Sequence, residues 1–425
     1  MCTRLIGLTL FGLLFRSTFT CGLLVRKSMK ALPIALLFCL VLGAAASAHA
    51  QETKWRMISE EAISLYEKGQ YDRAVTAIKK SLAVAEKAVG PHHPNTATSL
   101  NNLAELYRDH GQFAQAEPLY KRALAIREKY FGSSHALVAT SLNGHAELYR
   151  AQGRYAEAEP LYKRALAIRE KVLRPGHPDV AQTLNNLAEL YCIQGQYASA
   201  QPLYERSLSI REKALGPDHP TMATGLNNLA LIYHTQGQYA QAEPFYKRAL
   251  GIYEKTLGPD HSNVGTSLNN LAGIYHHQGQ YAQAEPLYRR ALAIREKTLG
   301  LDHPDVGRDL SSLAELYRIQ GQYAQAEPFY ERSLAIFEKT PGPYHLDMAT
   351  NLNNLALIYH TQGRYAQAEP FYQRALAIFE NTLGPDHPNV ERSLDNLAKL
   401  YRATDQTSAA EKLGLRLASF RSAQR

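Results

Sequence analysis

The sequence predicts an all-α fold, a solenoid of stacked helix–turn–helix units, because one pattern returns at a fixed distance along the chain. The tetrapeptide Asn-Asn-Leu-Ala begins at Asn101 and recurs every 42 residues through eight copies without an insertion. A period of this length is typical of stacked supersecondary units, so function is expected on a surface. Unchanged copies also begin at Asn185, Asn227, Asn269 and Asn353, and altered copies begin at Asn143, Ser311 and Asp395.

The first half of each unit is predicted to be a helix. With Ala97 taken as position 1 of the second unit, and each later unit starting 42 residues on, apolar residues fall at positions 4, 7, 8 and 11. This spacing places one apolar stripe along a helix. A Gly at position 15, which is Gly111 in this unit, then lets the chain leave the helix.

The second half is predicted to be a helix from about Phe113 to Tyr130, with apolar or small residues at positions 17, 20, 24, 27, 28 and about 31. Pro118 is expected near the first turn of this helix, where a missing N–H costs least. A Gly at position 36, such as Gly216, ends the helix and is usually followed by Pro-Asp-His-Pro. Only the linker at Arg174-Pro175-Gly176 departs from this pattern.

This frame resembles the tetratricopeptide repeat, with Leu at position 7, Ala at 8, Tyr at 11, Gly at 15, an aromatic residue at 17, Ala at 20, Tyr at 24 and Ala at 27. The resemblance covers about Trp55 to Ala410. The 42-residue unit and the segments Ala116 to Lys129 and Leu215 to Pro220 are similar to the kinesin light chain subtype. The resemblance implies a right-handed superhelix whose first helices line a concave, peptide-binding groove.

Four parts are predicted along the chain. Residues 1–50 form a leader outside the array, and residues 51–96 form a degenerate first repeat. Residues 97–390 form seven 42-residue repeats. Residues 391–425 form a partial repeat and a C-terminal capping helix. The end repeats of a solenoid lack one neighbour, so a more polar outer face is expected there.

The leader is predicted to direct export to the periplasm or to the outside of the cell. From Met29, a basic start, an apolar stretch and the sequence Ala-His-Ala ending at Ala50 indicate a secretory signal peptide cleaved after Ala50. Translation is expected to begin at Met29, because residues 1–28 hold a second, interrupted apolar stretch. No stable membrane insertion is expected after cleavage. The alternative is an uncleaved anchor, since the 18 residues 31–48 carry no charge and are long enough to be considered a membrane span.

The leader also accounts for much of the positive charge. Residues 1–50 hold five Lys and Arg residues and no acid, so the net charge falls from +8 to +3 without them. The balanced remainder removes the main support for nucleic-acid binding. Three of the four cysteines lie in the leader as well, so Cys192 is left alone after processing and an intrachain disulfide is excluded.

No catalytic or cofactor-binding motif is found in the sequence. A phosphate loop, a paired Cys-x-x-Cys, a His-Glu-x-x-His and a nucleophile elbow are all lacking, so we expect no enzyme activity, no cofactor and no metal. Equivalent histidines in the linkers, at position 39, would lie roughly 10 Å apart on stacked helices, too far to share one metal ion. They are expected to hydrogen-bond within their turns instead. They are His93, His135, His177, His219, His261, His303, His345 and His387.

The contact surface is predicted from a helical wheel of the first helix. Positions 4, 7, 8 and 11 face the core, so positions 2, 6, 9 and 13 face away from it, with 5 and 12 at the edge. Asn recurs at positions 5 and 6, and its carboxamide can both donate to and accept from the backbone of an extended peptide. In the alternative, these Asn side chains bond to the neighbouring repeat and set the solenoid geometry. The most continuous track is expected from Asn186 to Asn270, because Gly144 and Ser312 interrupt the series.

Positions 9 and 12 of the first helix vary together. In the repeats with Glu105, Glu147 or Glu315 at position 9, position 12 is Arg, and an i,i+3 ion pair worth about 0.2–0.5 kcal/mol is expected. Where position 9 is Leu or Gly, position 12 is His, and these repeats would bind differently near pH 6. The alternative is drift between surface solutions of equal stability. The candidate groove residues are Asn102, Asn186, Asn227, Asn228, Asn269, Asn270, Asn354, Asn396, Glu189, His234, His276, His277 and His360.

The third repeat is predicted to be a local soft spot. His145 replaces the core Leu, and Gly144 replaces the second Asn of the tetrapeptide. A buried imidazole needs a hydrogen-bond partner, and Gly weakens a helix interior by roughly 0.5–1 kcal/mol. We therefore expect faster hydrogen exchange across residues 139–151 than in the neighbouring repeats.

The function predicted from these features is that of a non-catalytic scaffold. Its groove is expected to bind an extended peptide or another segment of a protein partner, without nucleic acid. Small-molecule or glycan binding through the Tyr, Asn and His side chains of the central repeats is one alternative. A structural spacer in an envelope assembly is another.

Overall fold

The computed structural model describes residues 50–66, 68–340 and 345–423, and every regular element in them is an α-helix. This confirms the predicted fold class. The predicted export leader lies outside the described residues except for Ala50, and so does Gly342, the expected end of one second helix. The chain divides into two compact units, unit 1 up to Val172 and unit 2 from Leu173, and each is described by itself.

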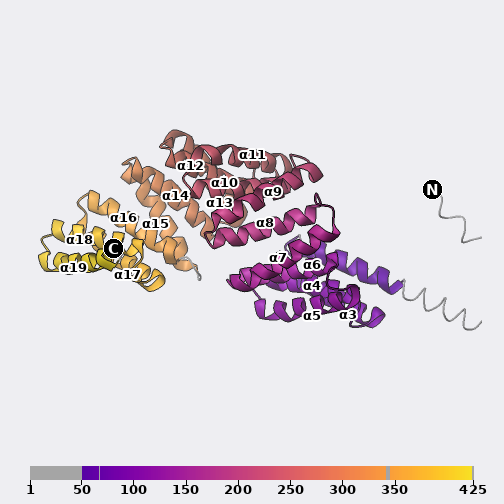
Figure 1. Ribbon diagram of the computed structural model, residues 1–425. Coiled ribbons are helices and arrows are strands. Elements are labelled where there is room, and N and C mark those ends of the chain that lie inside the picture. The colour runs from indigo at the N-terminus through magenta and orange to yellow at the C-terminus, as the bar shows by residue number, and fades with distance from the viewer. Residues whose placement is uncertain (1–49, 67, 341–344, 424–425) are drawn as a thin grey trace, which may run out of the picture. The chain divides into compact units, whose positions relative to one another are not determined.

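Successive helices in each unit are joined by short turns (Figure 1). Unit 1 contains a helix over residues 50–66, followed by α3 (Tyr71–Val89), α4 (Pro94–Asp109), α5 (Phe113–Phe131), α6 (Ala136–Ala151) and α7 (Tyr155–Val172). Unit 2 contains α8 (Pro178–Ile193), α9 (Tyr197–Leu215), α10 (Pro220–Thr235), α11 (Tyr239–Leu257), α12 (Ser262–His277), α13 (Tyr281–Leu299), α14 (Pro304–Ile319), α15 (Tyr323–Lys339), α16 (His345–Thr361), α17 (Tyr365–Leu383), α18 (Pro388–Ala403) and α19 (Thr407–Ala423).

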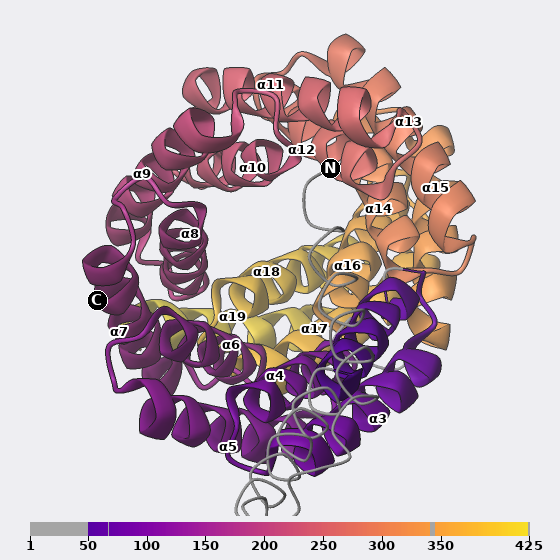
Figure 2. The same cartoon turned by 90° about the vertical axis from the view of Figure 1, so that its right-hand side faces the viewer.

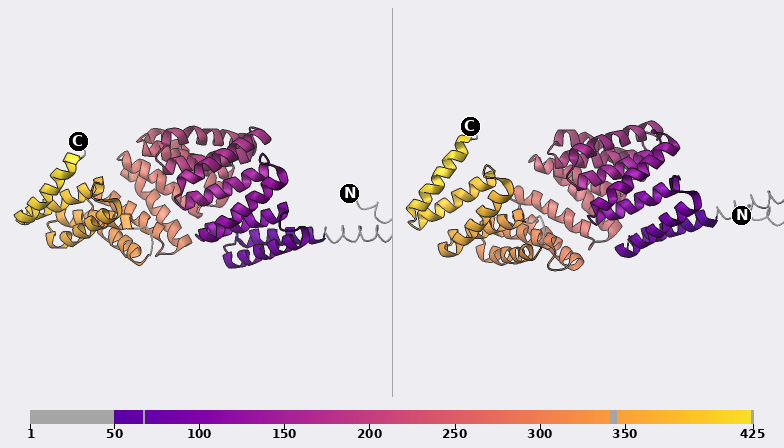
Figure 3. Two further views of the ribbon diagram at one scale, coloured as in Figure 1. Left: turned by 60° about the horizontal axis from the view of Figure 1, so that its bottom comes forward. Right: turned by 90° about the horizontal axis from the view of Figure 1, so that it is seen from below.

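Each repeat is a pair of packed helices, and the pairs stack side by side within a unit (Figure 3). In unit 2, Figure 2 shows the first helices α10, α12 and α14 on the inner side and the second helices α11, α13 and α15 on the outer side. The first helices of neighbouring repeats also contact one another directly, as α10 contacts α12. The inner surface of unit 2 is therefore built by first helices, as the resemblance implied.

The core of each repeat is made by the positions that the periodicity marked as apolar. In the second repeat Leu100, Ala104, Tyr120 and Ala123 are fully buried. Burial of a large apolar side chain stabilises a fold by about 1.5–3 kcal/mol, so the repeated Tyr of position 24 contributes strongly to every interface. Its equivalents Tyr162, Tyr204, Tyr246, Tyr288, Tyr330 and Tyr372 are at most 4 % exposed.

Seven of the first helices in the described residues begin at a histidine cap. The Nδ1 atom of His93 accepts a hydrogen bond of 3.1 Å from the backbone N–H of Asn95, and so satisfies one of the free donors at the start of α4. Seven of the eight linker histidines are thus structural, as predicted, and the structure describes no such cap for His345. The same cap is made by His135, His177, His219, His261, His303 and His387.

Glycine ends the helices where the chain must take a positive φ. Gly216 follows α9 with φ of 89°, and the turn residue Gly111 has φ of 70°. Residues other than Gly rarely adopt these backbone conformations, which explains the repeated Gly at both positions. In the last repeat Asp405 replaces the turn Gly and takes φ of 58°, a conformation that Asp tolerates better than most residues.

Pro118 lies further inside its helix than predicted. Because α5 begins at Phe113, Pro118 lies in the second turn and not near the first. Its ring removes the N–H that would bond to the carbonyl of Ala114. Ala114 is exposed, so water can bond to that carbonyl, and the helix continues to Phe131.

Ion pairs tie the second helices of consecutive repeats together. Arg122 pairs with Glu86 of the preceding repeat at 2.7 Å, and Arg248 pairs with Glu212 at 2.6 Å. Each pair is exposed and contributes about 0–1 kcal/mol, so this ladder aligns the repeats more than it stabilises them. The series continues with Arg164–Glu128, Arg290–Glu254, Arg332–Glu296, Arg374–Glu338 and Arg416–Glu380.

The third repeat buries the histidine that was predicted to weaken it. His145 is 5 % exposed, and neither ring nitrogen has a hydrogen-bond partner among the described residues. Its ring packs against Tyr149 at 4.4 Å between centroids. Gly144 has a packing reason, since a Cβ there would lie 2.7 Å from Cε1 of Tyr120.

Candidate functional site

A cavity of about 730 Å³ opens on the inner side of unit 2 and is named here the unit 2 groove. It is lined mainly by first helices of consecutive repeats, α12, α14, α16 and α18, with two Tyr side chains from α13. Each helix contributes residues from the side that faces away from its core. A ligand in this groove would therefore contact several repeats at once.

Glu315 is the centre of the polar floor of the groove. Its carboxylate accepts hydrogen bonds from Arg318 at 2.6 and 2.7 Å, from the Tyr330 hydroxyl at 2.7 Å and from the Asn354 amide at 3.2 Å. Burial acts to raise the pKa of Glu315, but the hydrogen bonds from Arg318 and Tyr330 outweigh it and the pKa is lowered. Glu315 is thus ionised and already neutralised by Arg318.

Asparagine amides continue this network across two more helices. The Asn396 amide donates to the Asn353 carbonyl oxygen at 3.1 Å, and the Asn353 amide donates to that of Asn354 at 3.5 Å. Asn354 in turn donates to Glu315. The amides thus point in one direction, and the carbonyl oxygen of Asn396 is left at the α18 end as an acceptor.

The rim of the groove carries a positive charge on Arg392, with no matching acid among the described residues. Arg392 is exposed, and its guanidinium hydrogen-bonds at 3.2 Å to the neutral amide oxygen of Asn389 on its own helix. His277 is also exposed, and its ring stacks on Tyr239 with 5.2 Å between centroids. These donors remain available to a ligand.

The described residues contain no group of three His, Cys, Asp or Glu side chains arranged to hold a metal ion. In the same residues, no helix is long and apolar enough to cross a membrane. The site is therefore described by its hydrogen-bonding groups and its charges.

Tetratricopeptide repeat models match eight overlapping segments between residues 56 and 421. The chain belongs to the tetratricopeptide repeat family. The matched segments are residues 56–129, 111–171, 137–213, 179–255, 221–297, 263–339, 310–381 and 347–421.

Similar solved structures include kinesin light chain-like repeats. Nearly identical TPR-like repeats of a Podosopora anserina kinesin light chain are 32% identical, covering 49% of this chain and 98% of that one, with a TM-score of 0.43. BtubC (BKLC) from P. vanneervenii is 26% identical, covering 55% of this chain and 94% of that one, with a TM-score of 0.47.

A Rap protein complexed with Competence and Sporulation Factor has a similar fold, at 16% identity and a TM-score of 0.55, covering 87% of this chain and 98% of that one. No curated protein sequence matches the chain significantly. Membership of this family indicates a protein–protein interaction scaffold.

Some of the candidate residues predicted for this tetratricopeptide protein line the unit 2 groove. They are His276, His277, Asn354 and Asn396. Asn102 lines a separate pocket in unit 1. The remaining candidates line neither cavity: Asn186, Asn227, Asn228, Asn269, Asn270, Glu189, His234 and His360. The groove thus lies nearer the C-terminus than the expected track from Asn186 to Asn270.

The Asn side chains at position 5 of these tetratricopeptide repeats link neighbouring repeats. The Asn227 amide donates to the Ser267 hydroxyl of the next repeat at 2.9 Å, and the buried Asn101 does the same to Ser141 at 3.1 Å. This is the alternative role considered for these asparagines. Position 6 is mixed, because Asn186 is only 5 % exposed and accepts from Gln182.

The coupling of positions 9 and 12 runs partly between repeats. Arg318 and Glu315 form the expected pair within one helix. Arg108 instead bonds to Glu147 at position 9 of the next repeat and to Asp109, so the predicted pair with Glu105 is wrong there. A helical wheel shows which residues are neighbours on one helix. It does not show contacts with the helix stacked beside it.

The histidines at position 12 share one environment. The His276 ring meets Tyr281 and Tyr288 of its own repeat edge-on, with centroids 5.8 and 6.3 Å apart. His234 and His360 meet their equivalent tyrosines in the same way. Burial lowers the pKa of all three imidazoles, so they gain protons below the usual range for His.

Sequence reasoning missed several groove residues whose positions it had nevertheless assigned to the correct face. Thr350 and Arg392 occupy position 2, Ser312 position 6, Leu357 position 9 and Ile319 position 13. These are the positions that the wheel turned away from the core. The candidates were chosen by recurrent residue type, whereas the groove-facing positions differ between repeats.

Proposed function

We propose that this tetratricopeptide protein is an exported, non-catalytic scaffold that binds an extended segment of a partner protein in the unit 2 groove. The observation that carries the proposal is the series of positions 2, 6, 9 and 13 presented by four first helices around one cavity of about 730 Å³. An extended segment can use the amides and hydroxyls of such a surface for its own backbone groups. The role requires no reaction step.

The charges of the groove favour an acidic segment. Glu315 is neutralised by Arg318, whereas Arg392 bonds to an amide. A carboxylate of the partner beside Arg392 would form a charge-assisted hydrogen bond. Ile319 is 43 % exposed on the same surface and offers an apolar contact next to the charged rim.

The test is binding of the protein from residue 51 onward to an immobilised library of acidic dodecapeptides. We expect Arg392→Ala and Asn396→Ala to weaken the best binders about tenfold, the loss typical of a central contact residue. The matched control is Asn270→Ala, since Asn270 holds the same repeat position as Asn396 outside the groove. Loss of binding in Asn270→Ala but not in Arg392→Ala would place the ligand on the middle repeats and contradict the proposal.

Export is the second part of the proposal, and it rests on the sequence around Met29 and Ala50. A signal peptide cleaved after an Ala-x-Ala sequence leaves a new N-terminus at Gln51. We expect N-terminal sequencing of the protein recovered outside the cytoplasm to start at Gln51. A mature chain that still starts at Met29 would show an uncleaved anchor instead.

A further inference from the structure

Unit 1 contains a small apolar pocket of its own, named here the N-terminal pocket. Its volume is about 240 Å³, and it lies between the helix 50–66, α3 and α4. Its walls include the buried side chains of Ala62, Ile78 and Leu106. An apolar cavity of about 150 Å³ can already hold benzene, so this pocket has room for a large aliphatic or aromatic side chain.

Two apolar residues at the mouth of this pocket are only partly covered. Ile63 is 49 % exposed and Tyr66 is 38 % exposed. The Tyr66 hydroxyl donates to Asp109 at 2.6 Å, which fixes the ring in place. Asp109 also accepts from Arg108 at 2.9 Å, so its charge is already compensated. A ligand side chain here would cover Ile63 and the ring of Tyr66.

Two polar groups of the pocket, the carboxylate of Glu105 and the side-chain amide of Asn102, form no hydrogen bond within the described residues. Glu105 is exposed and makes no hydrogen bond or ion pair with another described residue. The crowded surroundings raise the pKa of Glu105, and the nearby charge of Arg108 offsets this in part. The half-buried Asn102 beside it forms no side-chain hydrogen bond within the described residues. An incoming cation would stabilise the ionised Glu105.

We propose that the N-terminal pocket is a second binding site, for a partner segment in which Leu, Ile, Met or Phe stands next to Lys or Arg. The apolar side chain fills the pocket, the neighbouring cation pairs with Glu105, and Asn102 bonds to the backbone of the segment. An acidic segment is disfavoured here, because Glu105 repels it. The site therefore selects a different ligand from the unit 2 groove and does not depend on that groove.

The test uses fluorescent nonapeptides of Gly and Ser with a central Leu-Lys, Leu-Glu or Ser-Lys pair, titrated with the chain from residue 51 onward. We expect the Leu-Lys peptide to bind, and replacement of either residue to weaken binding about tenfold. Glu105→Gln should abolish the preference for Leu-Lys over Leu-Glu. Ile63→Ser should weaken both Leu peptides without affecting the fold, because Ile63 is half exposed.

Two controls separate this site from the rest of the chain. Glu189 holds the same repeat position as Glu105, so Glu189→Gln should leave binding of the Leu-Lys peptide unchanged. Arg392→Ala, in the unit 2 groove, should also leave it unchanged. Equal binding of the Leu-Lys and Leu-Glu peptides, or none at millimolar concentration, overturns the proposal. So does self-association of the chain that Ile63→Ser abolishes, which would assign the pocket to a second copy.

Discussion

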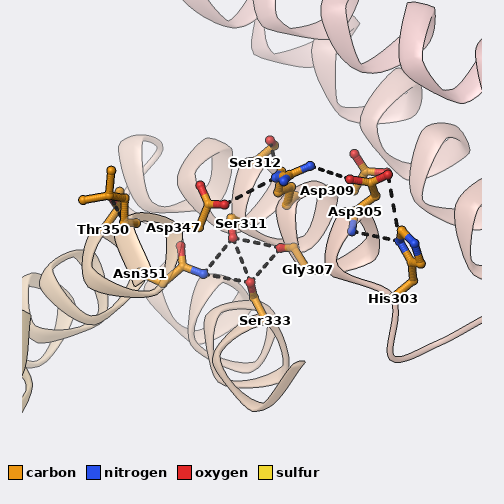
Figure 4. Close-up of polar contacts among 12 residues, drawn as sticks. His303, Asp305, Gly307, Asp309, Ser311, Ser312, Ser333, Asp347, Thr350 and Asn351 are labelled. Atoms are coloured by element: carbon orange, nitrogen blue, oxygen red, sulfur yellow. Dashed lines mark hydrogen bonds and ion pairs between the residues drawn. The ribbon is translucent and has the colours of Figure 1, made fainter. Parts of the chain in front are cut away.

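The side-chain amide of Asn351 donates a hydrogen bond of 2.7 Å to the hydroxyl of Ser311 in the preceding repeat (Figure 4). The link between Asn227 and Ser267 joins the same two positions, with Asn at position 5 and Ser at position 3. Here the residue types are exchanged, because Ser311 holds position 5 and Asn351 holds position 3. Asn351 also donates to Ser333 at 2.7 Å, and Ser333 donates to the carbonyl oxygen of Gly307 at 2.6 Å. The contact between repeats is kept while its donor and acceptor change places.

Exchanging the two residues should therefore preserve the link between these repeats. We expect Ser311→Asn and Asn351→Ser each to lower the free energy of unfolding by about 1 kcal/mol, since each removes the hydrogen bond between the two repeats. The double variant should recover most of this loss. Urea unfolding followed by circular dichroism measures the three values. Losses that simply add in the double variant would show that the two side chains are not coupled.

The sequence was sufficient to predict the repeated elements because local chemistry decides them. The helix expected from about Phe113 to Tyr130 runs from Phe113 to Phe131, and His93 caps its helix as the linker pattern indicated. Contacts between repeats were less predictable, since a periodic sequence does not say which neighbour a side chain meets. Thus Arg108 bonds to Glu147 rather than to Glu105. Arg392 was overlooked because position 2 is Thr in most repeats, and only Arg308 shares the Arg.

His145 should make unit 1 sensitive to acid. Burial lowers its pKa to about 4, from an ordinary value of 6.5. Below pH 6.5 the His145 imidazole binds a proton in the unfolded chain but stays neutral in the folded chain. The free energy of unfolding therefore falls as the pH drops from about 6.5 to about 4. The loss is at most about 3 kcal/mol. Thermal unfolding of an isolated unit 1, measured at several pH values, tests this.

The matched variant for this prediction is His145→Leu, which restores the residue found at position 7 in most repeats. We expect it to raise stability at pH 5 and to flatten the dependence on pH between 4 and 6.5. It should also slow hydrogen exchange across residues 139–151. An unchanged pH profile would assign the acid sensitivity to other groups.

Asp309 should have the opposite effect on unit 2. Its side chain is fully buried against Arg295, and its Oδ2 atom has no partner among the described residues. Burial raises the pKa of Asp309 to about 7, although Arg295 acts to lower it. The folded state then holds a proton that the unfolded chain releases above pH 4, so stability should fall as the pH rises from about 4 to about 7.

Asp309→Ser tests this directly, because Ser is the residue at the equivalent position Ser267. Arg211 is buried at the position equivalent to Arg295, and it is held by a backbone carbonyl and an amide instead of an acid. The variant should therefore fold. We expect it to be more stable than the wild type at pH 8 and to lose the decline in stability between pH 4 and 7. A variant less stable at pH 8 would show that the ion pair with Arg295 outweighs burial.

Removing one histidine cap should loosen one helix start. The Nδ1 atom of His387 accepts from the N–H of Asn389 at 3.1 Å. His387→Ala leaves that donor without its cap and should cost about 0.5–2 kcal/mol. His387→Asp supplies another acceptor at the same place and should cost less. Hydrogen exchange at the start of α18 reports the difference, and equal exchange in both variants would argue against a capping role.

The affinity of the unit 2 groove for acidic segments should be higher in mildly acidic solution than at neutral pH. Burial lowers the pKa of His276, although Glu315 of α14 opposes this effect, and the other groups facing the ring are His277, Arg318 and the α13 tyrosines Tyr281 and Tyr288. His276 therefore stays neutral until the pH falls below the usual His range.

We expect the affinity of the groove for an acidic peptide to be constant between about pH 8 and 6.5. It should rise only as the pH falls below 6.5, the ordinary value for His, because burial lowers the pKa of His276. Peptide carboxylates stay ionised as His276 gains its charge. Fluorescence anisotropy at stepped pH values measures this. In His276→Gln the rise should disappear, whereas His234→Gln, which changes an equivalent imidazole outside the groove, should keep it. An increase already complete at pH 6.5 would contradict this assignment, because burial lowers the pKa of His276 below its ordinary value of 6.5.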